Sequence, residues 1–165
     1  MLVRLYDLPP RDRFAAAVES LGVTVRRARS YEKEQVLEWV HACFGRNWAS
    51  ECSAAFAREP VTCFIAVHEG HVVAFIAYEV TCRDFAGPIG VAPEFRGRRI
   101  GHALLCACLH AMADLGYAYA IIGGVTELAG MAARSFQAIE IPGSSPGIYV
   151  DRLAAAGGRA RIEKY

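Results

Sequence analysis

The spacing of apolar residues along the first third of the chain predicts two strands and three helices. A short strand is expected at Leu2–Leu8 and a short helix at Arg11–Leu21, where apolar residues recur at helical intervals. Val23–Ala28 is rich in β-branched residues and favours a second strand. Two helices are expected next, at Ser30–Phe44 and Asn47–Phe56, and each begins at a residue type that commonly caps helices.

The middle of the chain changes from helical spacing to β-rich runs and then back again. Val61–Val67 and Val72–Val80 predict a hairpin, because the turn between them, His68–His71, contains a glycine. Phe85–Val91 predicts a further strand. Arg99–Leu115 then predicts a long helix whose apolar residues lie along one face.

The last third predicts a buried strand at Tyr117–Ile122 and a final helix at Ala129–Phe136. Ile139–Ile141 and Gly147–Val150 are expected to form a last pair of strands around a turn rich in Pro, Gly and Ser. This order of strands and helices is typical of a single mixed α/β domain.

Composition narrows the class of protein further. The 165 residues are 54% apolar and 21% charged with a net charge of +1, which is an ordinary balance for a globular domain. A near-neutral charge gives no reason to expect nucleic acid as a partner. No apolar stretch approaches the roughly 20 residues of a membrane-spanning helix, and charged residues near the N-terminus argue against a signal peptide. We therefore expect a cytoplasmic protein that binds neither nucleic acid nor membrane.

The cysteines predict neither a metal site nor a redox motif. They form no Cys-x-x-Cys pair, and no histidine spacing completes a zinc set. Buried, reduced thiols are expected at most of the six positions, which are Cys43, Cys52, Cys63, Cys82, Cys106 and Cys108.

The segment Ile89–Leu105 combines a strand, a basic turn and the start of an amphipathic helix. The first backbone N–H groups of a helix have no partner within the helix, and the helix dipole favours negative charge there. Gly97 and Gly101 let an anion approach the backbone without a Cβ in the way. The segment therefore predicts a phosphate-binding site.

Three arginines and a histidine supply the countercharge for such a site. Arg96, Arg98 and Arg99 lie in the turn, and arginine forms paired hydrogen bonds to phosphate oxygens. His102 follows in the first turn of the helix. A solvated basic turn at an ordinary helix start is the alternative, and the strand before it and the apolar helix after it favour phosphate binding.

A proline interrupts the strand that leads into the basic turn. Pro88 has no N–H for a ladder hydrogen bond, and Gly87 and Gly90 flank it. The strand is either bulged or at an edge, or it splays from its neighbour and leaves backbone groups free. In the second case an extended ligand with its own amides, such as pantetheine, could pair with Ile89 and Val91.

The same segment resembles the acetyl-CoA-binding motif of the GNAT superfamily of N-acetyltransferases, Val-x-Pro-x-x-Arg-Gly-x-Gly-Ile-Gly-x-x-Leu. Arg99 departs from the motif, because the family usually has glycine there; a right-handed helical backbone would accommodate the arginine. The order of elements from Val23 to Ile122 is also similar to that of the family, and the last third resembles a smaller set of uncharacterised bacterial members. The residues that match in register are Val91, Pro93, Arg96, Gly97, Ile100, Gly101 and Leu104.

The resemblance implies a GNAT fold, with a mixed central sheet that splays at its fourth strand and helices on both faces. It implies one N-acetyltransferase domain over residues 1–165, with an N-terminal extension at 1–22, a core at 23–150 and a tail at 151–165. Acetyl-CoA would be the co-substrate. It would be bound by Ile89, Gly90, Val91, Arg96, Gly97, Arg98, Arg99, Ile100, Gly101 and His102.

Catalytic residues are harder to assign than the donor site. In many GNAT enzymes a tyrosine on the last helix protonates the departing CoA thiolate, and residues 130–132 here are Gly-Met-Ala. Tyr149 is the nearest candidate for that acid. Glu79 and Asp84, at the ends of neighbouring strands, are candidates to deprotonate an amine, and ordinary solvated charges are the alternative.

The sequence leaves more than one function open. The family implies direct acetyl transfer to a small-molecule or peptide amine, and it leaves a homodimer open. The missing tyrosine also fits a CoA-binding sensor or degenerate enzyme that no longer transfers. An unrelated phosphate-binding domain is disfavoured, because the chain has neither a Gly-x-Gly-x-x-Gly run nor a P-loop lysine.

Overall fold

The core of the protein is a twisted six-stranded sheet. The computed structural model describes residues 1–124, 128–144, 147, 148 and 153. The strands lie in the order β1-β6-β5-β4-β3-β2, and neighbours are antiparallel except for β5 and β6, which are parallel. Their bounds are β1 (Leu2–Arg4), β2 (Val23–Arg27), β3 (Cys63–His68), β4 (His71–Tyr78), β5 (Phe85–Val91) and β6 (Tyr119–Ile122).

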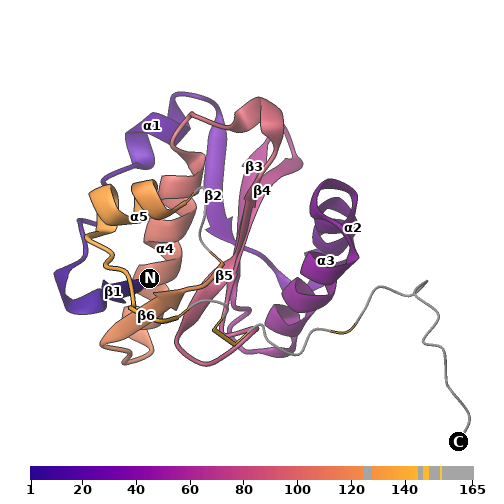
Figure 1. Cartoon of the computed structure of the whole chain (residues 1–165). Helices are drawn as coiled ribbons and strands as arrows, with labels where there is room; N and C mark the ends of the chain where they lie inside the picture. Colours follow the sequence, from indigo (N-terminus) through magenta and orange to yellow (C-terminus); the bar gives the residue numbers. More distant parts are fainter. Residues whose placement is uncertain (125–127, 145–146, 149–152, 154–165) are drawn as a thin grey trace, which may run out of the picture.

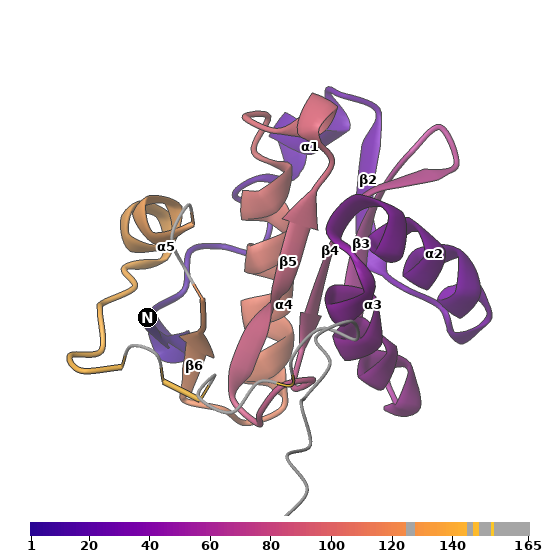
Figure 2. The ribbon, with the colours of Figure 1, turned by 45° about the vertical axis from the view of Figure 1, so that its right-hand side comes forward.

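Helices cover both faces of this sheet (Figures 1 and 2). On one face lie α2 and α3, and on the other lie α4, α1 and α5. Each face has its own hydrophobic cluster, so the sheet separates two cores. The helices are α1 (Ala15–Glu19), α2 (Lys33–Phe44), α3 (Arg46–Ser53), α4 (Ile100–Asp114) and α5 (Ala129–Phe136). The mixed α/β architecture expected from the sequence is confirmed.

The long helix α4 is the main support of the sheet on its face. Leu104, Leu109 and Met112 are fully buried, and Ile100 and Leu105 are almost so. A buried leucine or methionine side chain stabilises the fold by roughly 1.5–3 kcal/mol relative to an exposed one. This packing fixes the position of the N-terminus of α4 at the end of β5.

The sheet opens between β5 and β6. These two strands pair only at Phe85 with Ile121 and at Ala86 with Ile122. On its other side β5 stays paired with β4 as far as Val91. Pro88 therefore lies just past the point where the strands part, and the splay expected in this strand is confirmed.

Several expected helix and strand boundaries are wrong. Ser30 begins a short 3-10 helix and does not cap α2; the carboxylate of Glu32 caps this turn instead, accepting a hydrogen bond of 2.8 Å from the Arg29 amide. Asn47 lies inside α3, which begins after Gly45. Glycine fits there because the backbone has a φ of +90°.

The two ends of the described chain also differ from expectation. Turns occupy residues 11–14, so α1 is shorter than the helix expected at Arg11–Leu21. After Arg4 the first strand gives way to a 3-10 helix. Ile139 forms an isolated bridge with Leu2. The last two residues of the Gly147–Val150 segment lie outside the described part, so its expected pairing stays a prediction. Within the described residues, no helix is long and apolar enough to cross a bilayer.

Candidate functional site

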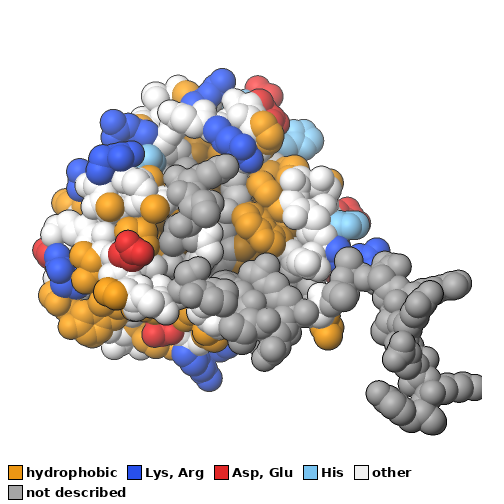
Figure 3. Space-filling view, viewed as in Figure 1, with side chains coloured by type: hydrophobic (Ala, Val, Ile, Leu, Met, Phe, Trp, Pro, Cys, Tyr) orange, Lys and Arg blue, Asp and Glu red, His pale blue; other side chains and the backbone are white. Residues whose placement is uncertain are grey.

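A cleft of about 580 Å³ lies where β5 separates from β6, and we call it the basic cleft. Its walls come from β5, the turn that follows it, the N-terminus of α4, and residues near α3 and α5. On the face shown in Figure 3, hydrophobic side chains gather near the centre with Lys and Arg side chains above them. The lining residues are Phe44, Trp48, Ile89, Gly90, Val91, Phe95, Arg96, Gly97, Arg99, Ile100, Gly101, His102, Gly124, Leu128 and Met131.

The chain turns sharply between β5 and α4 to form the basic end of this cleft. A 3-10 helix at Pro93–Phe95 is followed by Gly97 with a φ of +73° and Arg99 with a φ of +64°. No side chain caps α4, so its first amides keep no partner within the helix or from a cap. The turn therefore presents free N–H groups at a positive helix end.

The backbone of Arg99 corrects one expectation. A right-handed helical conformation was expected to accommodate the arginine, and the structure has it left-handed, with ψ of 7°. A left-handed residue costs a non-glycine side chain roughly 1–2 kcal/mol. The left-handed turn directs the chain from the loop into α4 and leaves the guanidinium in the lining of the cleft.

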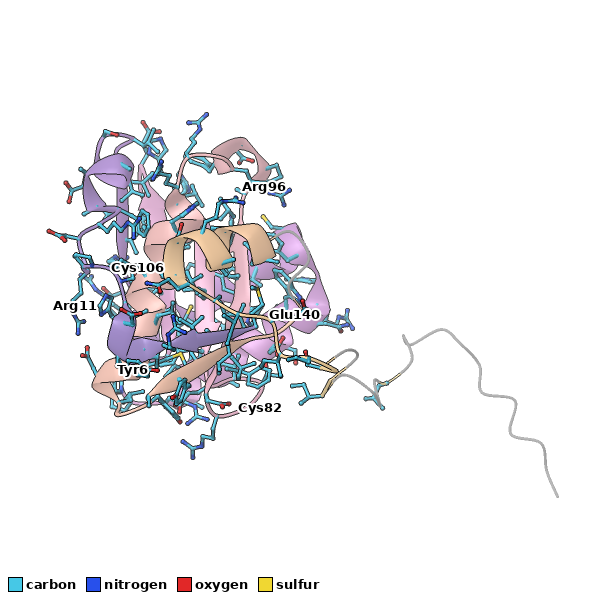
Figure 4. All side chains as sticks on the ribbon, turned by 60° about the vertical axis from the view of Figure 1, so that its left-hand side comes forward. Tyr6, Arg11, Cys82, Arg96, Cys106 and Glu140 are labelled. Carbon is cyan, nitrogen blue, oxygen red and sulfur yellow. The ribbon has the colours of Figure 1, made fainter. Side chains whose placement is uncertain are left out.

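Two of the three predicted arginines line the cleft and the third does not. Arg96 lies at the end of β5 (Figure 4) and its Nε donates a hydrogen bond of 3.1 Å to the carbonyl of Val91. Arg99 also lines the cleft. The guanidinium of Arg98 instead lies 5.7 Å from the centroid of the Phe95 ring. The countercharge in the cleft therefore comes from Arg96 and Arg99.

His102 lies beside these arginines and packs against Phe14, with 5.2 Å between the ring centroids. Burial lowers the pKa of His102 below its ordinary value, and the positive charges of Arg99, Arg134 and Arg13 lower it further. Arg134 comes from α5 and was not foreseen. A Cβ on Gly130 would lie 3.0 Å from its guanidinium, so the side chain folds back along its own helix.

The β5 residues predicted to bind the donor all line the basic cleft, as do Gly97, Ile100 and Gly101. Gly90 has a second role. A Cβ there would lie 2.5 Å from the ring of Phe44, so only glycine allows α2 to pack this closely on β5.

A second cavity of about 650 Å³ continues from the basic cleft toward the other end of β5, and we call it the aromatic chamber. The two share Phe44, Trp48, Ile89, Gly124 and Leu128. The remaining described residues of the aromatic chamber are Asn47, Glu51, Thr81, Phe85, Ala86, Gly87, Pro88, Ile122, Gly123 and Leu153. The two cavities therefore adjoin each other along β5.

The candidate proton-transfer residues lie elsewhere in the described structure. Glu79 is buried, with Arg58 and Arg83 guanidinium nitrogens 3.5 and 3.7 Å from its carboxylate, and it accepts a hydrogen bond from the hydroxyl of Tyr117. Asp84 lies in the turn before β5, where its carbonyl accepts a hydrogen bond from Ile121. Neither residue lines the basic cleft or the aromatic chamber. Tyr149 lies outside the described residues.

Glu51 is a carboxylate that the sequence did not bring forward. It lies on α3, lines the aromatic chamber and accepts a hydrogen bond from the hydroxyl of Thr81. The two residues are 30 positions apart, and no local motif links them. The sequence offered one indication of a site residue here, a charged residue in the segment that forms α3.

Comparison with known proteins agrees with this geometry. A family model of the acetyltransferase (GNAT) family matches residues 33–137. No curated protein matches the chain.

Several solved structures with similar folds are distant from this chain in sequence. The glucosamine N-acetyltransferase region of a fungal multi-domain β-N-acetylglucosaminidase is 17% identical, with a TM-score of 0.65, over 82% of this chain and 19% of that one. A GCN5-related N-acetyltransferase from Sphaerobacter thermophilus is 23% identical, with a TM-score of 0.62, over 80% of this chain and 45% of that one. This chain therefore matches less than half of the length of either.

A GNAT family acetyltransferase from Brucella melitensis, in complex with acetyl-CoA, is 19% identical, with a TM-score of 0.54, over 66% of this chain and 80% of that one. Such identities establish likeness of fold. The family match spans α2 to α5 and includes the turn between β5 and α4. The chain belongs to the GNAT family of acetyltransferases.

Proposed function

We propose that this protein transfers an acetyl group from acetyl-CoA directly to an amine. The observation that supports this most is the continuity of the basic cleft, which joins an unpaired stretch of β5 to a basic helix N-terminus. An elongated ligand with both amides and phosphates fits these two features together, and acetyl-CoA is such a ligand. The similar structure from Brucella melitensis holds acetyl-CoA.

In this proposal each end of the donor has its own partners. The pyrophosphate lies against the free amides at the start of α4 and is bound by Arg96 and Arg99. The pantetheine amides pair with the backbone of Ile89–Val91, which β6 leaves open. The acetyl group then points toward the aromatic chamber, which would hold the amine.

The reaction itself needs few groups. The amine loses a proton to water, its nitrogen attacks the thioester carbon, a C–N bond forms and the C–S bond breaks. The CoA thiolate takes up a proton as it leaves. Tyr149 remains our candidate for that acid. We assign no step to Glu79 or Asp84, because both lie outside the described cavity linings.

Two measurements test the proposal. Isothermal titration with acetyl-CoA is expected to give one saturable site, and a thiol-release assay is expected to show amine-dependent turnover above background hydrolysis. No binding at millimolar acetyl-CoA would end the proposal. Binding without turnover for any amine would favour a CoA-binding sensor instead, an alternative that fits the lack of tyrosine among the described lining residues.

We expect acetyl-CoA binding to take up a proton at His102. In the free protein, burial and the charges of Arg99, Arg134 and Arg13 hold the pKa of His102 below its ordinary value. A bound pyrophosphate offsets those positive charges and raises the pKa. Because protonated His102 is then favoured by the ligand, the affinity of the parent relative to a His102→Gln variant should rise by about fivefold as the pH falls from 7.5 to 5.5. Titrations across this range measure it.

A His102→Gln variant is the control for this prediction. The 3′-phosphate of CoA also titrates near pH 6, in the opposite sense, since it loses charge on protonation. The difference between the parent and the variant therefore isolates the histidine. The two proteins should bind alike at pH 7.5 and diverge at pH 5.5. Parallel pH profiles would contradict the prediction.

A further inference from the structure

The two cavities along β5 differ in the sign of their charge. In the basic cleft the described ionisable side chains are Arg96, Arg99 and His102. In the aromatic chamber the described lining has one ionisable side chain, Glu51. Arg96 follows β5 in the chain and Cys82 precedes it, and Figure 4 shows these two residues toward opposite ends of the molecule. The two adjoining cavities therefore form a site for anions and a site for cations.

The carboxylate of Glu51 is held in place without being neutralised. The hydroxyl of Thr81 donates a hydrogen bond to its Oε1. Among the described residues no cationic group lies within 4.0 Å of it. Glu79 is the opposite case, because two arginines and a tyrosine hydroxyl already surround its carboxylate. Of the two glutamates, Glu51 is the one whose carboxylate has no cationic partner among the described residues.

The rest of the chamber is apolar and aromatic. Phe44 and Trp48 stack with 5.1 Å between ring centroids, and both line the chamber together with Phe85 and Leu128. Such walls bury an apolar body, and aromatic faces also attract a nearby ammonium group. A carboxylate or phosphate on the ligand would meet Glu51 and no described cation.

We propose that the acceptor is a small primary amine with an apolar body and no anionic group, and that Glu51 binds its ammonium head. This inference rests on the proposed acetyl transfer and names its substrate class. A protonated amine loses hydration on entering the chamber, and a fixed carboxylate compensates for that loss. An amino acid carries the same amine beside a carboxylate, which Glu51 repels.

A matched pair of acceptors tests whether the chamber disfavours an amine that also carries an anionic group. 2-Phenylethylamine and phenylalanine share the amine and the ring, and they differ by one carboxylate. With saturating acetyl-CoA, the kcat/KM for 2-phenylethylamine should exceed that for phenylalanine by about tenfold or more. Equal or reversed preference would overturn the inference and leave acetyl transfer itself standing.

Variants of Glu51 test the residue. Glu51→Gln keeps the hydrogen bond with Thr81 and removes the charge, so the KM for 2-phenylethylamine should rise about tenfold. The ratio of kcat/KM for 2-phenylethylamine to that for phenylalanine should fall. Glu51→Asp should recover part of the loss. The Kd for acetyl-CoA and the urea midpoint should stay unchanged in both variants. Glu38→Gln, an equal change of charge on the exposed side of α2, is the control and should leave all of these values as they were.

The remaining outcomes separate the two proposals. An unchanged KM in Glu51→Gln would overturn the assignment of Glu51. If acetyl-CoA binds and neither acceptor is acetylated, the inferred amine class is wrong while the donor site stands. If acetyl-CoA does not bind, the proposed function falls and the acceptor inference falls with it.

Discussion

Replacement of both Arg96 and Arg99 by alanine is expected to weaken acetyl-CoA binding about 100-fold. Both side chains line the basic cleft next to the uncapped N-terminus of α4. Each substitution would remove one charge-assisted hydrogen bond to the pyrophosphate. The fold-increases in the dissociation constant from the two substitutions multiply. Isothermal titration at fixed ionic strength measures the change, because exposed charges are screened by salt.

Arg98→Ala is the matched control for this double variant. It removes one positive charge from the same turn, but the side chain of Arg98 lies on the Phe95 ring and outside the cleft lining. Its effect on the Kd should stay within about threefold, as expected for a screened charge at this distance. A loss in Arg98→Ala as large as in the double variant would show that the turn acts by net charge alone, and our placement of the pyrophosphate would be wrong.

Gly90→Ala is expected to lower the free energy of unfolding by about 2 kcal/mol. The added Cβ would lie 2.5 Å from Cζ and 2.6 Å from Cε2 of Phe44. That ring has little room to move, because it packs against Trp39, Trp48 and Phe75. Relief of the overlap would require α2 to shift away from the sheet. Urea unfolding measures the loss.

Two further variants show whether the cause is the contact with Phe44. Gly101→Ala places its Cβ 3.6 Å from Cγ2 of Val91, an ordinary contact, so its stability should be unchanged or slightly higher while acetyl-CoA binds more weakly. The double variant Gly90→Ala, Phe44→Leu should be more stable than the sum of the single changes predicts. Simple additivity in this pair would contradict the contact.

The basic cleft was largely readable from local signals. The bounds of β5 and α5 agree with the sequence expectation, and α4 begins and ends within one residue of it. The turn before α4 could be assigned to anion binding because the free amides and the arginines belong to one short segment. Even there, only the structure separated Arg98 from Arg96, because both occupy the same turn and their side chains point to different neighbours.

The acceptor side shows what local signals miss. Glu79 and Asp84 were chosen for their places at strand ends, and the partners of Glu79 come from Arg58, Arg83 and Tyr117, which lie in three separate segments. No local sequence pattern identifies Glu51 as a site residue. Its position in the chamber lining depends on how α3 packs beside β5 and on a hydrogen bond from Thr81, which is distant in sequence.

Hydrophobic periodicity and helix-end chemistry act over a few residues, and they were sufficient for the α/β class, most strands and helices, and the phosphate-binding turn. Other features appear only in the folded chain: the pairing of Leu2 with Ile139 and Ile121, and the separation of charge between the two ends of β5. These depend on contacts between residues far apart in sequence, where many pairings satisfy the same local preferences and only the packing of the whole domain selects one.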